Sequence, residues 1–176
     1  MTNPQLNQKL EFAIKFLVKA FNELGNNPKP VILHSIEVAI YLKNLDYNEK
    51  IITGALLHDI LEDTSISKKE IKESFGLDIF NLIASLTFDS NISNRVERAK
   101  HEIDQCLKAG KDSMIIKAAD LLQNADYIQF AKDLETKNYI FQKIKYFLDR
   151  SSPLIGTEKP WIDLKAKYQQ ILDKPE

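Results

Sequence analysis

The sequence predicts an all-α protein, a compact bundle of several helices that forms a single domain over residues 1–176. Apolar residues recur at three- and four-residue steps, which is the spacing of a helix face. Glycine and proline are scarce, with 5 and 6 in 176 residues, so turns are few and helices long. No segment alternates polar and apolar residues convincingly in the manner of a strand. A chain of this length can bury a sizeable core.

The first helix is predicted from its end signals. Asn3 and Pro4 fit an N-cap followed by proline at the first helical position, and Gly25 ends the apolar face that follows. Ser67 and Glu70 have the spacing of a capping box, and Gly76 closes the short helix that it starts. The remaining helices of this half are expected over residues 31–44, from an N-cap near Asn48 to His58, and over residues 78–88.

The second half continues in the same way. Residues 89–94 are polar and predict a loop, and residues 109–110 stop the helix that follows it. Asp112 is expected to cap a further helix that runs to about Lys132. The helices predicted here cover residues 95–107, 112–132, 135–150 and 160–172.

The composition limits which classes of function are possible. The 24 basic and 25 acidic residues give a net charge of -1, so the sequence predicts no DNA, RNA or membrane partner. Cys106 is the one cysteine, which excludes an intramolecular disulfide and fits a reducing compartment. No signal segment or run long enough to span a bilayer is visible, and a cytoplasmic location is expected.

Ionisable side chains interrupt three apolar segments, and each lies on a different predicted helix. They are His34, the pair His58 and Asp59, and Asp120. Burying such groups without partners is costly, and a divalent cation bound by imidazole and carboxylate would supply one. Each of these residues also has a simpler interpretation. A histidine can be an ordinary core residue, and an aspartate can cap a helix or form an ion pair. Together they predict a metal site in the core of the bundle, where ligands from separate helices can converge.

The spacing after His58 adds carboxylates. Glu62 lies four residues after His58, and Asp63 lies four after Asp59, so each pair shares a face if the helix continues. His101 lies in a polar segment and is expected to be solvated. No glycine-rich phosphate loop or cysteine pair offers another type of site.

These motifs resemble the HD superfamily of metal-dependent phosphohydrolases, and within it the hydrolase domain of RelA/SpoT proteins and their small stand-alone relatives. The family's "LLHDxxEDT" element matches residues 56–64, and "KxADxxxN" matches residues 117–124. Pro30 before His34 also fits, and the likeness runs from Phe12 to about Phe130. A "T-D…ER" stretch is matched by Thr87, Asp89, Glu97 and Arg98.

The resemblance implies an activity and roles for individual residues. RelA/SpoT hydrolases remove pyrophosphate from the 3′ position of guanosine 3′,5′-bis(diphosphate), ppGpp, which leaves GDP. By this likeness one divalent ion, usually Mn²⁺, is held by His34, His58, Asp59 and Asp120. Glu62 and Asp63 would form the catalytic pair, and Asn124 would contact the nucleotide.

Several positions that contact the substrate in this family hold different residues in this sequence. The basic run expected after the first helix is reduced to Lys29, and Val31, Leu121 and Gln123 replace residues that are usually aromatic or basic. The basic residues left to neutralise substrate phosphate are Arg98, Lys117 and Lys29. Two alternatives therefore stay open: an HD hydrolase for another nucleotide or phosphoester, and a non-catalytic module that binds a nucleotide or a metal. The sequence does not give the oligomeric state.

Overall fold

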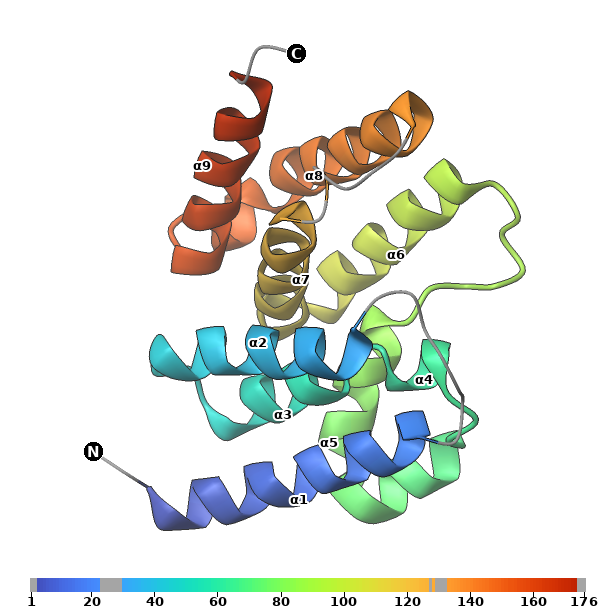
Figure 1. Cartoon of the computed structure of the whole chain (residues 1–176), viewed down its shortest axis with the longest axis vertical. Coiled ribbons are helices and arrows are strands. Elements are labelled where there is room, and N and C mark those ends of the chain that lie inside the picture. Colours follow the sequence, from blue (N-terminus) through green and yellow to red (C-terminus); the bar gives the residue numbers. More distant parts are fainter. Residues whose placement is uncertain (1–2, 23–29, 127, 129–132, 174–176) are drawn as a thin grey trace. The chain divides into compact units, whose positions relative to one another are not determined.

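A computed structural model describes residues 3–22, 30–126, 128 and 133–173 (Figure 1). The described residues form helices joined by turns and loops, and none of them lies in a strand. This confirms the predicted all-α class. The chain forms two compact units, residues 1–87 and residues 88–176. None of the described helices is both long enough and apolar enough to cross a membrane.

Unit 1 is built around its third helix. Its elements are α1 (Pro4–Asn22), α2 (Val31–Asn44), α3 (Glu49–Leu57), α4 (Ile60–Asp63) and α5 (Lys68–Leu86). Helix α3 packs against α1, α2 and α5, and every residue of α3 from Ile51 to Leu57 is buried. The core of this unit therefore surrounds α3, directly before the His58-Asp59 pair.

The predicted helix starts of unit 1 are present. The Oδ1 atoms of Asn3 and Asn48 each accept a backbone N–H from the first turn of their helix, at 3.2 and 3.1 Å. Ser67 and Glu70 form the capping box that opens α5. Gly76 divides α5 into the two helices expected from the sequence, because its φ of 83° and ψ of 173° lie in a region that essentially only glycine adopts.

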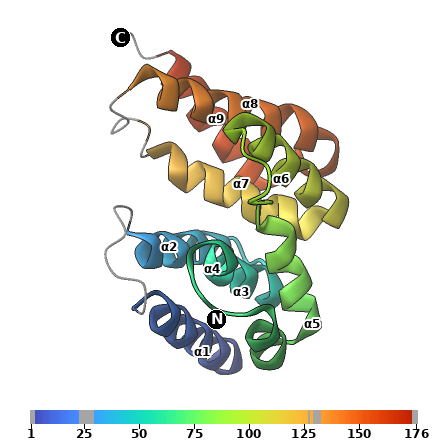
Figure 2. The same ribbon diagram turned by 90° about the vertical axis from the view of Figure 1, so that its right-hand side faces the viewer.

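Unit 2 is built around α7. Its helices are α6 (Arg95–Ala109), α7 (Lys111–Ala125), α8 (Leu134–Ile155) and α9 (Lys159–Leu172) (Figure 2). Helix α7 packs against the other three, and α6 also packs against α8. Residues 113–121 and Ala125 of α7 are buried as a result, and these include Lys117 and Asp120.

The predicted start of α7 is wrong. Asp112 was expected to be the N-cap, but Gly110 occupies that position and Asp112 lies in the first turn. Gly110 has a φ of 107°, and this lets the chain turn within one residue from the end of α6 into α7. Helix α7 ends at Ala125, whereas we expected it to continue to about Lys132. Residues 127 and 129–132 of that predicted segment lie outside the described residues.

Candidate functional site

Two buried histidines face each other in unit 1. His34 lies in the first turn of α2, where its N–H donates to the Pro30 carbonyl at 2.9 Å, and His58 follows the last residue of α3. Their exposed fractions are 0 % and 2 %. The ring centroids are 5.4 Å apart in an edge-to-face arrangement. The packing of α2 on α3 thus brings together two side chains that are 24 positions apart in the sequence.

The contacts of His58 define which ring nitrogen holds a proton. Nδ1 lies 2.8 Å from the carbonyl oxygen of Ala55, and since a carbonyl can only accept, Nδ1 must be the donor. Nε2 lies 3.1 Å from Oδ1 of Asp59. When the ring is neutral, Nε2 of His58 and Oδ1 of Asp59 both carry lone pairs, which repel each other. A cation bound between these two atoms would relieve that repulsion. Hydrogen bonding of Nδ1 to a carbonyl is also the usual support of a histidine that binds a metal through Nε2.

The continuous helix that would place His58 with Glu62, and Asp59 with Asp63, on shared faces is not formed. Helix α3 ends at Leu57, and Asp59 adopts φ -92° and ψ -4° before the single turn of α4 begins at Ile60. These angles still lie in the broad right-handed helical region, and Asp59 is the N-cap residue of α4. Across this break the Asp59 carboxylate lies beside the His58 ring.

Helix α4 holds the predicted catalytic carboxylates. The backbone N–H groups of Glu62 and Asp63 both donate to the Asp59 carbonyl, at 3.1 and 3.0 Å. Glu62 is half-buried and Asp63 is exposed. The hydroxyl of Thr64 donates to the Ile60 carbonyl at 2.6 Å and so closes the turn. Glu62 and Asp63 are therefore fixed within one turn of the His58-Asp59 pair.

Asp120 is buried in the middle of α7 in unit 2, with an exposed fraction of 4 %. Both of its carboxylate oxygens are contacted from its own helix. Lys117 Nζ lies 2.9 Å from Oδ2, and the side-chain amide of Asn124 donates to Oδ1 at 2.5 Å. The "KxADxxxN" spacing places these three side chains on one face of α7, since residues three and four apart are neighbours on a helix.

Glu102 is a buried charged residue that the sequence analysis did not single out. It lies on α6 with an exposed fraction of 4 % and forms ion pairs with Lys117 and, at 3.1 Å from Oε2, with Lys143 of α8. Burial raises the pKa of Glu102, but the two ammonium groups outweigh it and the net pKa is lowered. A helical pattern pointed to its burial, because Ala99, Ile103 and Cys106 share its face of α6.

The remaining predicted phosphate contacts have their own neighbours in unit 2. Arg98 is half-buried; its guanidinium lies 4.7 Å from the centre of the Phe88 ring, and Nη1 donates to the Ile92 carbonyl at 3.4 Å. Lys117 is buried between Glu102 and Asp120. Lys29 lies outside the described residues. His101 is exposed, as expected.

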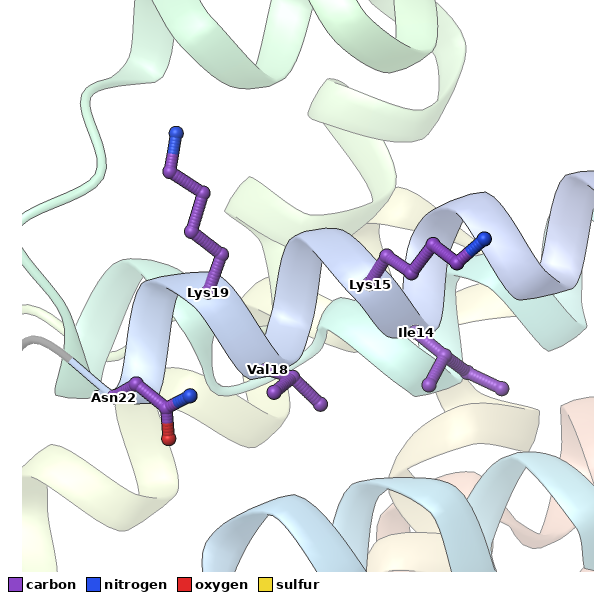
Figure 3. A pocket seen from close by; sticks show the side chains of 5 residues that line it. All are labelled: Ile14, Lys15, Val18, Lys19 and Asn22. Atoms are coloured by element: carbon purple, nitrogen blue, oxygen red, sulfur yellow. The ribbon is translucent and has the colours of Figure 1, made fainter.

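A surface hollow on α1 does not include the predicted site residues. It is lined by Ile14, Lys15, Val18, Lys19 and Asn22 (Figure 3). The apolar Val18 and the ammonium of Lys19 extend from different sides of the helix. Lys15 pairs with Glu11 on the same helix, and both side chains are largely exposed. Ordinary solvated lysines account for this surface.

The HD domain model matches residues 10–144 of the chain. The chain belongs to the HD domain family. The match extends over parts of both units, since it includes residues on either side of Thr87. An HD hydrolase domain implies a divalent metal, and the imidazoles and carboxylate around His58 are the kinds of ligand that such a cation takes.

The relatives of this HD chain include both long and short proteins. A guanosine-3′,5′-bis(diphosphate) 3′-pyrophosphohydrolase of Aquifex aeolicus is 32 % identical over 69 % of this chain, but that segment is 18 % of its own length. The corresponding MESH1 enzyme of Drosophila melanogaster is 31 % identical over 57 % of this chain and 56 % of its own. The chain thus spans about a fifth of the first of these relatives and about half of the second.

Solved structures extend the likeness to almost the whole chain. The structure of a metazoan ortholog of SpoT, a protein described as hydrolysing ppGpp with a role in starvation responses, has a TM-score of 0.81 and 25 % identity. It covers 97 % of this chain and 98 % of its own. A Listeria monocytogenes structure with 23 % identity and a TM-score of 0.69 shares the fold.

Proposed function

We propose that the chain is a metal-dependent phosphohydrolase that removes pyrophosphate from the 3′ position of ppGpp. The observation that carries the proposal is the likeness over 97 % of the chain to a stand-alone protein that hydrolyses ppGpp. Relatives bearing the name of this activity support it. We propose that both units form one HD domain, because the family match spans residues 10–144.

The proposed metal ligands are His34, His58, Asp59 and Asp120, and Mn²⁺ is the proposed ion. His34, His58 and Asp120 each offer a ligand atom and are all buried, and the Asp59 carboxylate is placed against His58. A bound divalent cation supplies Lewis-acid chemistry, which stabilises charge on phosphoryl oxygens and makes water more acidic. The carbonyl of Ala55 holds the His58 ring so that Nε2 is the atom presented to a cation.

Glu62 and Asp63 are the proposed catalytic pair. In the reaction the oxygen of water forms a bond to phosphorus, the bond from phosphorus to the 3′ oxygen breaks, and a proton must reach that leaving oxygen. A carboxylate beside the water can accept its proton, and the same or the neighbouring group can deliver one to the nucleoside. Their attachment to a one-turn helix directly after Asp59 suits this task, because it keeps both groups within a turn of the proposed ligands.

The proposed substrate contacts are Asn124, Arg98, Lys29 and Lys117. Asn124 and Arg98 are half-buried, so part of each side chain is accessible from the surface of unit 2. Lys117 is the weakest candidate, because its ammonium is buried between two carboxylates. A small nucleotide as the sole partner and a cytoplasmic location stay predictions.

The decisive experiment is a substrate panel with the Mn²⁺-loaded protein. We would incubate it with ppGpp, GTP, GDP and a generic phosphodiester, and measure released pyrophosphate and phosphate separately. Release of pyrophosphate from ppGpp with GDP as the co-product is expected. Turnover of another member of the panel at a clearly higher kcat/KM than ppGpp would identify a different substrate. No turnover of any member, with metal bound, would leave the non-catalytic module as the better interpretation.

A further inference from the structure

Glu102 carries a buried carboxylate, with 4 % exposed, that forms ion pairs with two cations. The ammonium of Lys117 on α7 pairs with one oxygen, and that of Lys143 on α8 lies 3.1 Å from the other. Lys143 is the more accessible partner, with 19 % of its side chain exposed against 5 % for Lys117. A buried ion that loses a partner is strongly destabilised, so these contacts are tightly maintained.

Lys117 connects this carboxylate to Asp120. Its single ammonium group pairs with Glu102 and also lies 2.9 Å from Oδ2 of Asp120. Two carboxylates therefore share the charge of Lys117, and Asp120 receives only part of it. Lys143 provides the second positive charge that the group of four requires, but it does so at Glu102.

Because Glu102 and Asp120 share the charge of Lys117, the charge state of Glu102 affects cation binding at Asp120. If Glu102 were neutral, Lys117 would become a full counter-ion of Asp120, and a metal would have to compete with an adjacent ammonium. With Glu102 ionised, the ammonium is drawn toward α6 and the Asp120 carboxylate keeps negative charge for a ligand. The amide of Asn124 on Oδ1 then limits the rotation of that carboxylate.

We propose that Glu102 is a positioning residue for metal binding: it holds Lys117 between two carboxylates and so keeps Asp120 available to a divalent cation. The inference rests on the proposed function through one assignment, Asp120 as a ligand. It gives Lys117 a role inside the protein in place of contact with substrate phosphate. It also accounts for the costly burial of the charged side chains of Glu102, Lys117 and Asp120 on α6 and α7.

The test compares Mn²⁺ affinity, measured by titration calorimetry, in Glu102→Gln and wild type. The glutamine keeps the shape and loses the charge. We expect Kd for Mn²⁺ to rise about 10- to 100-fold, the range seen when support of a metal ligand is removed. Saturating Mn²⁺ should restore kcat with an unchanged KM for ppGpp. The matched control is Asp104→Asn, which removes the charge that pairs α6 with Arg150 and weakens the contact with Tyr146 of α8, and which should leave Kd unchanged.

A double-mutant cycle separates this mechanism from a purely structural one. If Glu102 acts through Lys117, then Glu102→Gln should no longer change the Mn²⁺ affinity in a Lys117→Met background. An equal loss of affinity in both backgrounds would contradict the proposal. So would a Kd of Glu102→Gln within twofold of wild type in a protein that melts cooperatively.

Three further outcomes bear on the proposal. If Glu102→Gln does not fold, the test uses Glu102→Asp, which keeps the charge but has a side chain shorter by one methylene group. The Kd of Glu102→Asp for Mn²⁺ should exceed that of wild type. An unchanged Kd would overturn the inference. Mn²⁺ binding that depends on Glu102 in a protein without ppGpp hydrolysis would reject the proposed substrate and support the inference. A wild-type protein that binds no Mn²⁺ would overturn both.

Discussion

Nε2 of His58 lies 3.1 Å from Oδ1 of Asp59, while Nδ1 of the same ring contacts the Ala55 carbonyl at 2.8 Å. The carbonyl contact assigns a proton to Nδ1, so the atom that faces Asp59 is the one able to bind a cation. The pair lies between α3 and α4, with His58 as the C-cap of α3 and Asp59 as the N-cap of α4. This geometry supports the proposal that both residues bind the metal.

Asp59→Asn is expected to weaken metal binding more than any change in the neighbouring carboxylates. The asparagine amide has the same size as the carboxylate but no charge. Loss of that charge should raise the Kd for Mn²⁺ by at least about tenfold, as measured by calorimetry. Asp63→Asn is the control, because Asp63 lies on the next turn and is exposed. Equal Mn²⁺ affinities in Asp59→Asn and wild type would remove Asp59 from the proposed ligand set.

Asp63→Asn should separate chemistry from metal binding. If Asp63 handles a proton in the reaction, its loss should lower kcat for ppGpp by about 10²- to 10⁴-fold, while the Kd for Mn²⁺ stays at the wild-type value. Steady-state kinetics at saturating Mn²⁺ would measure this. Glu62→Gln measured alongside would show which of the two carboxylates contributes more. Normal turnover by Asp63→Asn would exclude a catalytic role for it.

Metal removal is expected to lower the thermal stability of the protein. Free Mn²⁺ at 100 times its Kd should raise the free energy of unfolding by about 2.7 kcal/mol, and EDTA should reverse the gain. His34→Gln should lose most of this increment because a buried ligand is missing. His101→Gln is the matched control, since that histidine is exposed. Melting curves with Mn²⁺ and with EDTA measure the difference. The same Mn²⁺-dependent rise in His34→Gln would place the ion elsewhere.

Cys106 should be chemically inert in the folded protein. Burial raises the pKa of its thiol from 9.0 to about 12, and the neighbouring charges only modify that effect. The thiolate is the reactive form, so labelling with a disulfide reagent at pH 8 should be far slower in the native state than in guanidinium chloride. Rapid labelling without denaturant would show that the site opens.

The same shift predicts a pH dependence of stability. Between the unfolded pKa of about 9 and the folded value of about 12, the folded state retains a proton that the unfolded state releases. The contribution of Cys106 is therefore complete below pH 9 and is lost as the pH rises toward 12. Cys106→Ala should lose stability less steeply over this range, as measured by denaturant titrations. Parallel curves for the two proteins would contradict the shift.

Gly76→Ala and Gly110→Ala should each destabilise the protein although no atom obstructs the new methyl group. A Cβ atom at either position would have no neighbour within 4 Å, but φ is +83° at Gly76 and +107° at Gly110. An alanine in this backbone region costs of order 1–3 kcal/mol. Urea denaturation would measure the change. A loss below about 0.5 kcal/mol, typical of neutral surface changes, would mean that the backbone relaxes at that position.

Local signals in the sequence determined most of the helices and the chemical type of the site. The caps at Asn3, Asn48 and Ser67 and the break at Gly76 were predictable, because the groups that stabilise a helix end lie within a few residues of it. The unusual ionisable residues in apolar segments also stood out, since burial of such groups needs an explanation. The "LLHDxxEDT" element added the family and its activity by resemblance.

Only the tertiary structure decided which buried charges meet. Glu102 and Lys143 are separated by 41 positions, and their pairing depends on the packing of α6 against α8, which no local pattern encodes. The path of the chain after His58 is a second case. The sequence predicted a helix as far as His58 and left open whether it continued through Glu62, and in the structure a separate turn, α4, begins at Ile60. A helix end depends on its own neighbours in sequence, whereas the partner of a buried charge depends on which helix packs against it.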